Sequence, residues 1–167
     1  MTAAVLAAIA ALMLVEARIS ARHETALRAR GAHEPPDDVY RSMQITYPGA
    51  FALMGIEGLT RDDTSASQWI AGALIFVLAK SLKYWAMASL GPYWSFRVLV
   101  VPGAPLVSHG PYRFARHPNY LGVIGELLGA AILLNARITG PLATLAFAVL
   151  IKRRIAVEER ALSRSSR

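Results

Sequence analysis

Long apolar segments alternate with short polar connections along this chain. Five of them are predicted to be helices, because each is apolar over a length close to that needed to cross the hydrocarbon core of a bilayer, roughly 30 Å. Their predicted ranges are 2–20, 39–59, 68–90, 118–135 and 138–157. The polar connections are too short for a separate soluble domain. The pattern predicts an all-α, polytopic integral membrane protein with about five transmembrane helices and a single domain over residues 1–167.

Prolines and glycines set the boundaries of these helices. Gly31, Pro35 and Pro36 are expected to end the first helix. Residues 91–116 contain several prolines among β-branched and aromatic residues, which predicts an ordered, non-helical loop at the membrane surface. The last two apolar segments are slightly short for a simple span, so they predict a C-terminal helical hairpin that is tilted or re-entrant.

Composition supports the membrane assignment. The 167 residues are 54% hydrophobic and only 17% charged. There is no cysteine, so disulfides, thiolate metal ligands and cysteine nucleophiles are excluded. The net charge of +7 does not predict nucleic-acid binding, because the basic residues lie in loops that flank apolar segments.

The basic residues are distributed unevenly between the two sides of a five-helix arrangement. One side carries the basic C-terminal segment and Arg18, Arg22, Arg28, Arg30, Arg41, Arg97, Arg113 and Arg116, and the other carries Arg61 and Arg137. Positive charge is enriched on the cytoplasmic side of membrane proteins. We therefore expect the N-terminus outside, the C-terminus inside and the loop over residues 91–116 at the cytoplasmic face of the membrane.

Some polar residues lie inside the apolar segments. Lys80 and Lys83 fall in the second half of the third segment, where they either snorkel to the interface, as we expect, or face a polar cavity. Glu126 is expensive inside lipid and is expected to face a cavity or a partner, either as a paired structural carboxyl or on the substrate side.

Small and aromatic residues complete the membrane pattern. Gly122, Gly125, Gly129 and Ala130 are expected to allow close helix packing. The three tryptophans are expected to anchor the helices at the interface: Trp69, Trp85 and Trp94.

Candidate chemistry is concentrated in residues 110–122, with the sequence GPYRFARHPNYLG. His117 precedes Pro118, and a residue before proline avoids the helical conformation while proline favours the first helical position. A helix is therefore expected to begin at Pro118. The unpaired N–H groups of its first turn form a natural seat for a carboxylate or a phosphate.

Two motifs in this order resemble a known signature. RHPNYLG at residues 116–122 and EERAL at residues 158–162 resemble the RHPxYxG and EExxL motifs of the isoprenylcysteine carboxyl methyltransferase family and its phospholipid methyltransferase relatives. The resemblance extends through PGAPLVSHGPYR, residues 102–113, and more weakly through residues 16–34. It covers most of the chain.

The resemblance implies an S-adenosylmethionine-dependent methyltransferase. In the family, the cofactor lies in a cytoplasm-facing pocket closed by the last helices and the loop before them, and a lipophilic acceptor enters from the bilayer. By motif position, the implied cofactor contacts are Arg97, Ala104, Pro105, Leu106, Val107, Tyr112, His117, Pro118, Asn119, Tyr120 and Glu158. Arg97 occupies a position where relatives do not always have arginine. Arg154 is implied to act in catalysis on the acceptor side, with Glu126 as a second substrate-side candidate.

These implied roles agree with the chemistry of the side chains. Glu158 can accept hydrogen bonds from a ribose or an ammonium group, and the helix start near His117, with Tyr112, can hold a carboxylate. Arg154 can stabilise an anionic oxygen nucleophile because arginine stays charged. A nucleophile that is not already ionised needs a base, and the sequence does not decide between His117 and His109.

The acceptor has several candidates. The short chain and the PGAPLV segment resemble bacterial members of the family, which favours O-methylation of a polyketide lipid such as an alkylpyrone or alkylresorcinol. The alternatives are carboxyl methylation of a prenylated cysteine, N-methylation of an ethanolamine phospholipid and, from a different class, NADPH-dependent reduction of a sterol-type lipid. No metal site is predicted, since no ligand spacing such as HExxH occurs. The expected partners are the lipophilic acceptor and membrane lipids, without nucleic acid or an obligatory protein partner.

Overall fold

The structure, a computed structural model, describes residues 2–61 and 64–165. The described residues form five α-helices and two 3-10 turns, with no named strand. In chain order they are α1 (Thr2–Ala29), α2 (Tyr40–Leu59), α3 (Ala66–Leu90), η1 (Gly91–Tyr93), η2 (Gly110–Arg113), α4 (Pro118–Leu133) and α5 (Thr139–Ser165). The all-helical prediction is confirmed. The first and last helices both run further than predicted, to Ala29 and Ser165, because the polar residues that follow each apolar part continue the helix out of it.

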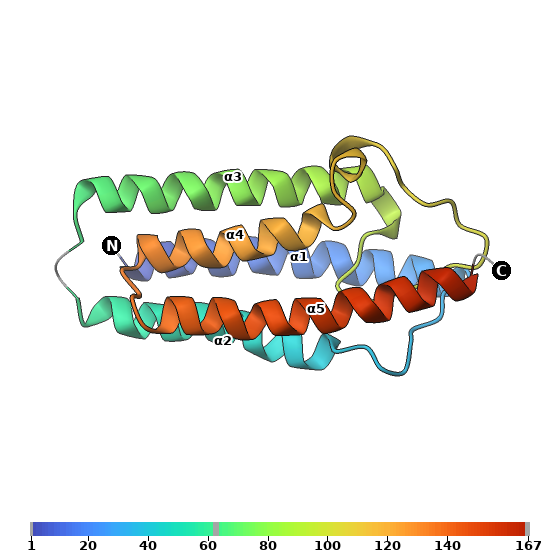
Figure 1. Ribbon diagram of the computed structural model, residues 1–167, viewed down its shortest axis with the longest axis horizontal. Coiled ribbons are helices and arrows are strands. Elements are labelled where there is room, and N and C mark those ends of the chain that lie inside the picture. The colour runs from blue at the N-terminus through green and yellow to red at the C-terminus, as the bar shows by residue number, and fades with distance from the viewer. Residues whose placement is uncertain (1, 62–63, 166–167) are drawn as a thin grey trace.

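The five helices run along the long axis of an elongated bundle (Figure 1). One end holds the N-terminus, the end of α2 and the turn between α4 and α5. The other end gathers the end of α1, the start of α2, the long loop after α3 and the C-terminal part of α5. Segments far apart in the sequence therefore meet at this second end.

Within the described ranges, two helical segments are long and apolar enough to cross a membrane: Thr2–Ala29 and the continuous segment Ala66–Tyr93. Helix α4 is apolar but shorter, as the sequence predicts for a hairpin helix. Large apolar side chains cover the outside of the bundle, including Ile45, Ile70, Leu78 and Leu145. An apolar exterior of this kind is expected of a protein that faces lipid.

Glycines bring α3 and α4 into close contact. A Cβ atom on Gly129 would lie 2.5 Å from the backbone nitrogen of Phe76, and one on Gly72 would lie 2.5 Å from that of Leu133. Gly122 is similarly close to Lys83 and to the carbonyl of Ala79. The prediction of close packing at Gly122 and Gly129 is confirmed, because a side chain at either position would push the helices apart.

The buried lysines of α3 form a charge cluster with two glutamates. Lys80 Nζ lies 2.9 Å from Glu16 Oε1 and 2.7 Å from Glu126 Oε2. Lys83 Nζ lies 2.6 Å from Glu16 Oε2, and Tyr47 donates a hydrogen bond to Glu126. These five residues are called the buried charge cluster below. The snorkelling expected of Lys80 and Lys83 is wrong, because carboxylates on α1 and α4 supply counter-charges inside the bundle.

Candidate functional site

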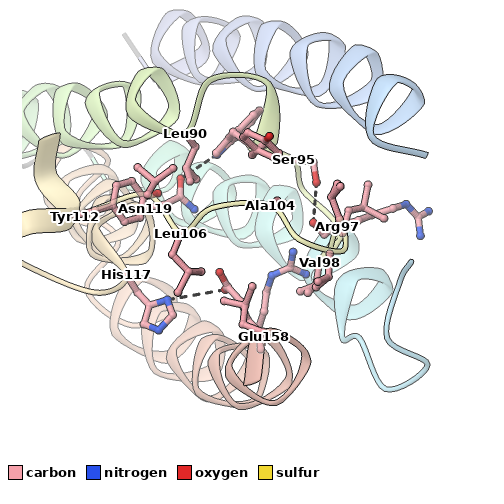
Figure 2. A pocket seen from close by; sticks show the side chains of 18 of the residues that line it. Leu90, Ser95, Arg97, Val98, Ala104, Leu106, Tyr112, His117, Asn119 and Glu158 are labelled. Atoms are coloured by element: carbon pink, nitrogen blue, oxygen red, sulfur yellow. Dashed lines mark hydrogen bonds and ion pairs between the residues drawn. The ribbon is translucent and has the colours of Figure 1, made fainter. Parts of the chain in front are cut away.

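A cleft opens at the end of the bundle that carries the long loop (Figure 2). Its walls come from the loop after α3, from η2, from the first turn of α4 and from the outer half of α5. The lining residues are Leu90, Tyr93, Trp94, Ser95, Arg97, Val98, Leu99, Val100, Val101, Ala104, Pro105, Leu106, Val107, Tyr112, His117, Asn119, Tyr120, Arg154, Glu158 and Leu162.

The loop is held in place by backbone pairing and by apolar packing. Val100 and His33 exchange two backbone hydrogen bonds of 3.0 and 3.1 Å, so the connection after α1 pairs with the cleft wall. Val98 and Val100 pack against Ala161 and Leu162 of α5. Gly103 has a φ of +72°, a backbone conformation that suits glycine, at the turn before Ala104. The loop is thus ordered, as predicted, but the prediction that it is non-helical is wrong at two short places, the 3-10 helices η1 and η2.

A hydrogen-bonded chain of polar side chains joins α4 to α5 in the cleft. Helix α4 begins at Pro118, which confirms the start predicted from the His117–Pro118 pair. The Tyr120 hydroxyl donates to Glu158 Oε2 at 2.9 Å and accepts from Arg154 Nε, also at 2.9 Å. Tyr120 therefore fixes the relative positions of a carboxylate and a guanidinium on α5.

The guanidinium of Arg154 has three partners. Besides Tyr120, it donates to Asp38 Oδ1 at 2.8 Å and to the carbonyl of Phe96. Asp38 Oδ2 also accepts from the backbone N–H of Val98 at 3.1 Å. Arg154 and Asp38 are both buried, so this pair ties α5 to the start of α2 and to the cleft wall.

Arg97 is oriented differently. Figure 2 shows its side chain extending away from His117 and Asn119. Its guanidinium bonds to Glu34 at 2.7 Å and to Glu24 at 3.2 Å, and it stacks over the ring of Tyr40 at 4.3 Å. The aliphatic part of the Arg97 side chain therefore lines the cleft, while its guanidinium is paired with Glu24 and Glu34 outside it.

Two glutamates of α5 flank the imidazole of His117. Nδ1 lies 3.9 Å from Glu158 Oε2 (Figure 2), and Nε2 lies 3.4 Å from Glu159 Oε1. Tyr112 lies in η2, where burial and the charge of Glu158 raise its pKa. The Tyr112 hydroxyl is therefore protonated at neutral pH and can donate a hydrogen bond.

The structure brings together most of the side chains that the sequence singled out. Ten of the eleven implied cofactor contacts line the cleft, as does Arg154. Pro118 instead lies buried beneath it as the first residue of α4. Glu126 lies in the buried charge cluster and is absent from the lining. Of the two open interpretations of Glu126, the geometry matches the paired structural carboxyl.

Sequence reasoning missed part of the wall. Trp94 is only 3% exposed, lines the cleft and donates from its indole nitrogen to Asn119 at 3.3 Å. Its expected role as an interface anchor is therefore wrong, although Trp69 and Trp85 do remain partly exposed. Tyr93, Ser95 and Val98 also line the cleft but were not predicted, because they belong to no sequence motif. Their one signal is their position in the loop before the first motif.

The apolar helical bundle is that of a membrane protein, and the cleft at one end is its candidate ligand site. The model of the isoprenylcysteine carboxyl methyltransferase (ICMT) family matches residues 72–164, more than half of the chain. The chain therefore belongs to this family of membrane methyltransferases. Membership supports methyltransferase activity.

Two bacterial relatives cover nearly the whole chain. An uncharacterized protein of Bacillus subtilis, YpbQ, is 34% identical over 151 residues, which are 90% of each chain. An uncharacterized protein of Haemophilus influenzae is 26% identical over 158 residues, 94% of this chain and 92% of its own. No solved structure matches the chain significantly. The likeness thus includes α1 and α2, which precede the region matched by the family model.

Proposed function

We propose that this protein transfers a methyl group from S-adenosylmethionine to an oxygen atom of a lipophilic acceptor, most simply a polyketide lipid of the alkylpyrone or alkylresorcinol type. The observation that carries the proposal is the convergence of both family motifs on one cleft. His117, Asn119 and Tyr120 come from the first motif and Glu158 from the second. The Tyr120–Glu158 hydrogen bond joins the two directly.

The donor set of the cleft fits a nucleoside with an amino-acid tail. Val98, Val100 and Leu162 provide an apolar surface for a purine. Glu158 can accept from ribose hydroxyls or from an ammonium group, and its side chain is 32% exposed within the cleft. Tyr112 and the first turn of α4 offer hydrogen-bond donors for a carboxylate.

When bound, S-adenosylmethionine supplies an electrophilic methyl group for an in-line displacement. The residues of this chain hold the two reactants close and exclude water. Tyr120, fixed between Arg154 and Glu158, keeps Glu158 in one rotamer. Arg154 stabilises negative charge on the acceptor oxygen while Asp38 holds its guanidinium in place.

The binding test is calorimetric titration of S-adenosylhomocysteine into detergent-solubilised protein. We expect saturable binding that is lost in His117→Ala and Glu158→Ala variants that keep their helical circular dichroism. Glu57→Gln is the matched control, because Glu57 bonds to Thr139 near the opposite end of the bundle. Folded wild-type protein that binds NADPH and not S-adenosylhomocysteine would overturn the proposal in favour of a reductase.

The acceptor test follows transfer of a labelled methyl group to four lipids in mixed micelles. An alkylpyrone, an alkylresorcinol, a prenylated cysteine and phosphatidylethanolamine represent the acceptor classes. Methylation of the first two is expected. Exclusive labelling of the prenylated cysteine or of the phospholipid would show that the cofactor assignment holds and the acceptor assignment fails.

A further inference from the structure

Helix α1 presents one buried stripe to the rest of the bundle. Its buried residues are Ile9, Glu16, Ser20 and Leu27, while the other side chains are exposed or half-buried. Their spacing places them on one face of the helix. The two in the middle, Glu16 and Ser20, are polar. The centre of the stripe is therefore held by ion pairs and a hydrogen bond, which require a defined geometry.

Glu16 is bound through both of its carboxylate oxygens. Lys80 approaches Oε1 at 2.9 Å and Lys83 approaches Oε2 at 2.6 Å, and the Glu16 side chain is 1% exposed. Shifting α1 by one residue would move Glu16 by about 1.5 Å along the axis and 100° around it. Such a shift would break both ion pairs. The buried charge cluster therefore fixes α1 both along and around its axis.

Apolar contacts alone would fix this helix poorly in a bilayer. Lipid tails are as apolar as leucine, so an apolar helix face gains little by moving from lipid to protein. A buried ammonium group without a counter-charge is costly, which makes the pairing with Glu16 a strong positional constraint.

The next turns of α1 bind the cleft wall. Ser20 Oγ accepts from the backbone N–H of Phe96 at 2.8 Å, and His23 Nδ1 donates to the carbonyl of Trp94, also at 2.8 Å. Glu24 pairs with Arg97 at 3.2 Å. Three residues of α1 thus hold residues 94–97, and Trp94 and Arg97 line the cleft.

We propose that Glu16 is a positioning residue for the cofactor cleft: its pairing with Lys80 and Lys83 sets the position of α1, and α1 in turn seats residues 94–97. The inference rests on the proposed function in that the cleft is taken to bind S-adenosylmethionine. It assigns to α1, which lies before the region matched by the family model, a part in forming the site. Its effect on the cleft acts through Ser20, His23 and Glu24.

Trp94 provides a readout that needs no ligand. The chain has three tryptophans, so Trp69→Phe and Trp85→Phe leave Trp94 as the sole tryptophan. In this background, in which Trp94 is the only tryptophan excited selectively over the tyrosines, Glu16→Gln should shift Trp94 emission to the red and increase its quenching by acrylamide. The affinity for S-adenosylhomocysteine should fall about tenfold, equivalent to 1.4 kcal/mol. Leu14→Ala, an exposed position on the same helix, is the control and should change neither quantity.

A double variant separates positioning from simple destabilisation. Glu16→Gln with Lys83→Met removes one charge of each sign and leaves Lys80 paired with Glu126. Its melting temperature should recover toward that of the parent, while the Trp94 shift and the weaker binding persist. If Trp94 emission and the affinity for S-adenosylhomocysteine both recovered together with the melting temperature, the proposal would be refuted. It would also be refuted if Glu16→Gln alone behaved like Leu14→Ala. If the parent protein with Glu16 intact bound no S-adenosylhomocysteine, the proposed function would be refuted. The Trp94 emission of Glu16→Gln would still show whether Glu16 positions residues 94–97.

Discussion

Arg154 and Asp38 illustrate how a single pair can hold the cleft together. Both side chains are buried, and each makes a further bond to the wall, Arg154 to the carbonyl of Phe96 and Asp38 to the N–H of Val98. A buried charge that loses its partner keeps its desolvation cost and loses its compensation. Loss of the pair should therefore both destabilise the fold and distort the cleft.

Removing the charge of Asp38 should be strongly destabilising. Asp38→Asn keeps the shape of the side chain but leaves Arg154 without a counter-charge, and we expect a loss of roughly 3 to 5 kcal/mol in the free energy of unfolding. The neighbouring Asp37→Asn is the control. Its pair with Arg160 is exposed, so its loss should be about 1 kcal/mol or less. Denaturant unfolding in detergent measures both, and equal effects would contradict the assigned role of Asp38.

Glu34 gives a pH dependence with a defined sign. Burial by itself raises the pKa of the Glu34 carboxyl, but hydrogen bonds from Arg97 and Arg28 outweigh burial, and the net pKa lies below its ordinary value of 4.5. A carboxyl with a lowered folded-state pKa stabilises the fold above the unfolded pKa, and this stability is lost as the pH falls through the folded pKa.

Glu34→Gln should therefore lower the melting temperature at pH 7 and have progressively less effect below pH 4.5, where the wild-type carboxyl becomes protonated. Thermal unfolding of both proteins across this pH range measures the difference. A difference that stays constant or grows in acid would show that the ion pairs with Arg28 and Arg97 do not stabilise the fold.

Among the helices, the contact between α3 and α4 depends most on small residues. Gly129→Ala would place a methyl group within 2.9 Å of the backbone nitrogen, Cα and Cβ of Phe76. The resulting separation of the helices should cost roughly 1 to 3 kcal/mol and loosen the nearby buried charge cluster.

Gly49→Ala is the control for this change. Gly49 lies inside α2, and a Cβ there meets no atom within 4 Å. Alanine favours the helix over glycine, so this variant should be neutral or more stable by up to about 1 kcal/mol. Melting temperatures in the same detergent compare the two, and a harmless Gly129→Ala would mean that α3 and α4 pack less closely than described.

Over the whole molecule, the end of the bundle that carries the cleft holds the end of α1, the loop after α3 and the C-terminal part of α5 (Figure 1), and these segments contain most of the lysines and arginines. We expect this end to face the cytoplasm. Because the chain has no cysteine, single cysteines can report the orientation. Arg116→Cys, near the cleft, should be protected from a membrane-impermeant maleimide in intact bacteria, and Ser67→Cys, at the start of α3, should be labelled.

Lysis of the cells should make Arg116→Cys reactive. The Arg116 side chain is 88% exposed, so protection in intact cells reports the membrane and not burial. The reverse labelling pattern would place the cleft outside and remove access to a cytoplasmic cofactor.

The helical class and the helix start at Pro118 follow from the sequence, because apolar segment length and the proline rule act locally. About half of the cleft residues were predicted from the family resemblance, since each motif keeps its residues together along the chain. Tyr112, His117 and Glu158 are examples, and all three line the cleft.

Which distant groups meet depends on tertiary packing. The sequence offers Lys80, Glu16 and Glu126 as isolated polar residues in apolar segments, and nothing local shows that they neutralise one another across three helices. The burial of Trp94 against Asn119 likewise depends on how the loop folds back over α4. Pairing of buried charges and closure of a cleft are contacts between segments far apart in the chain, and their geometry exists only once the helices have packed.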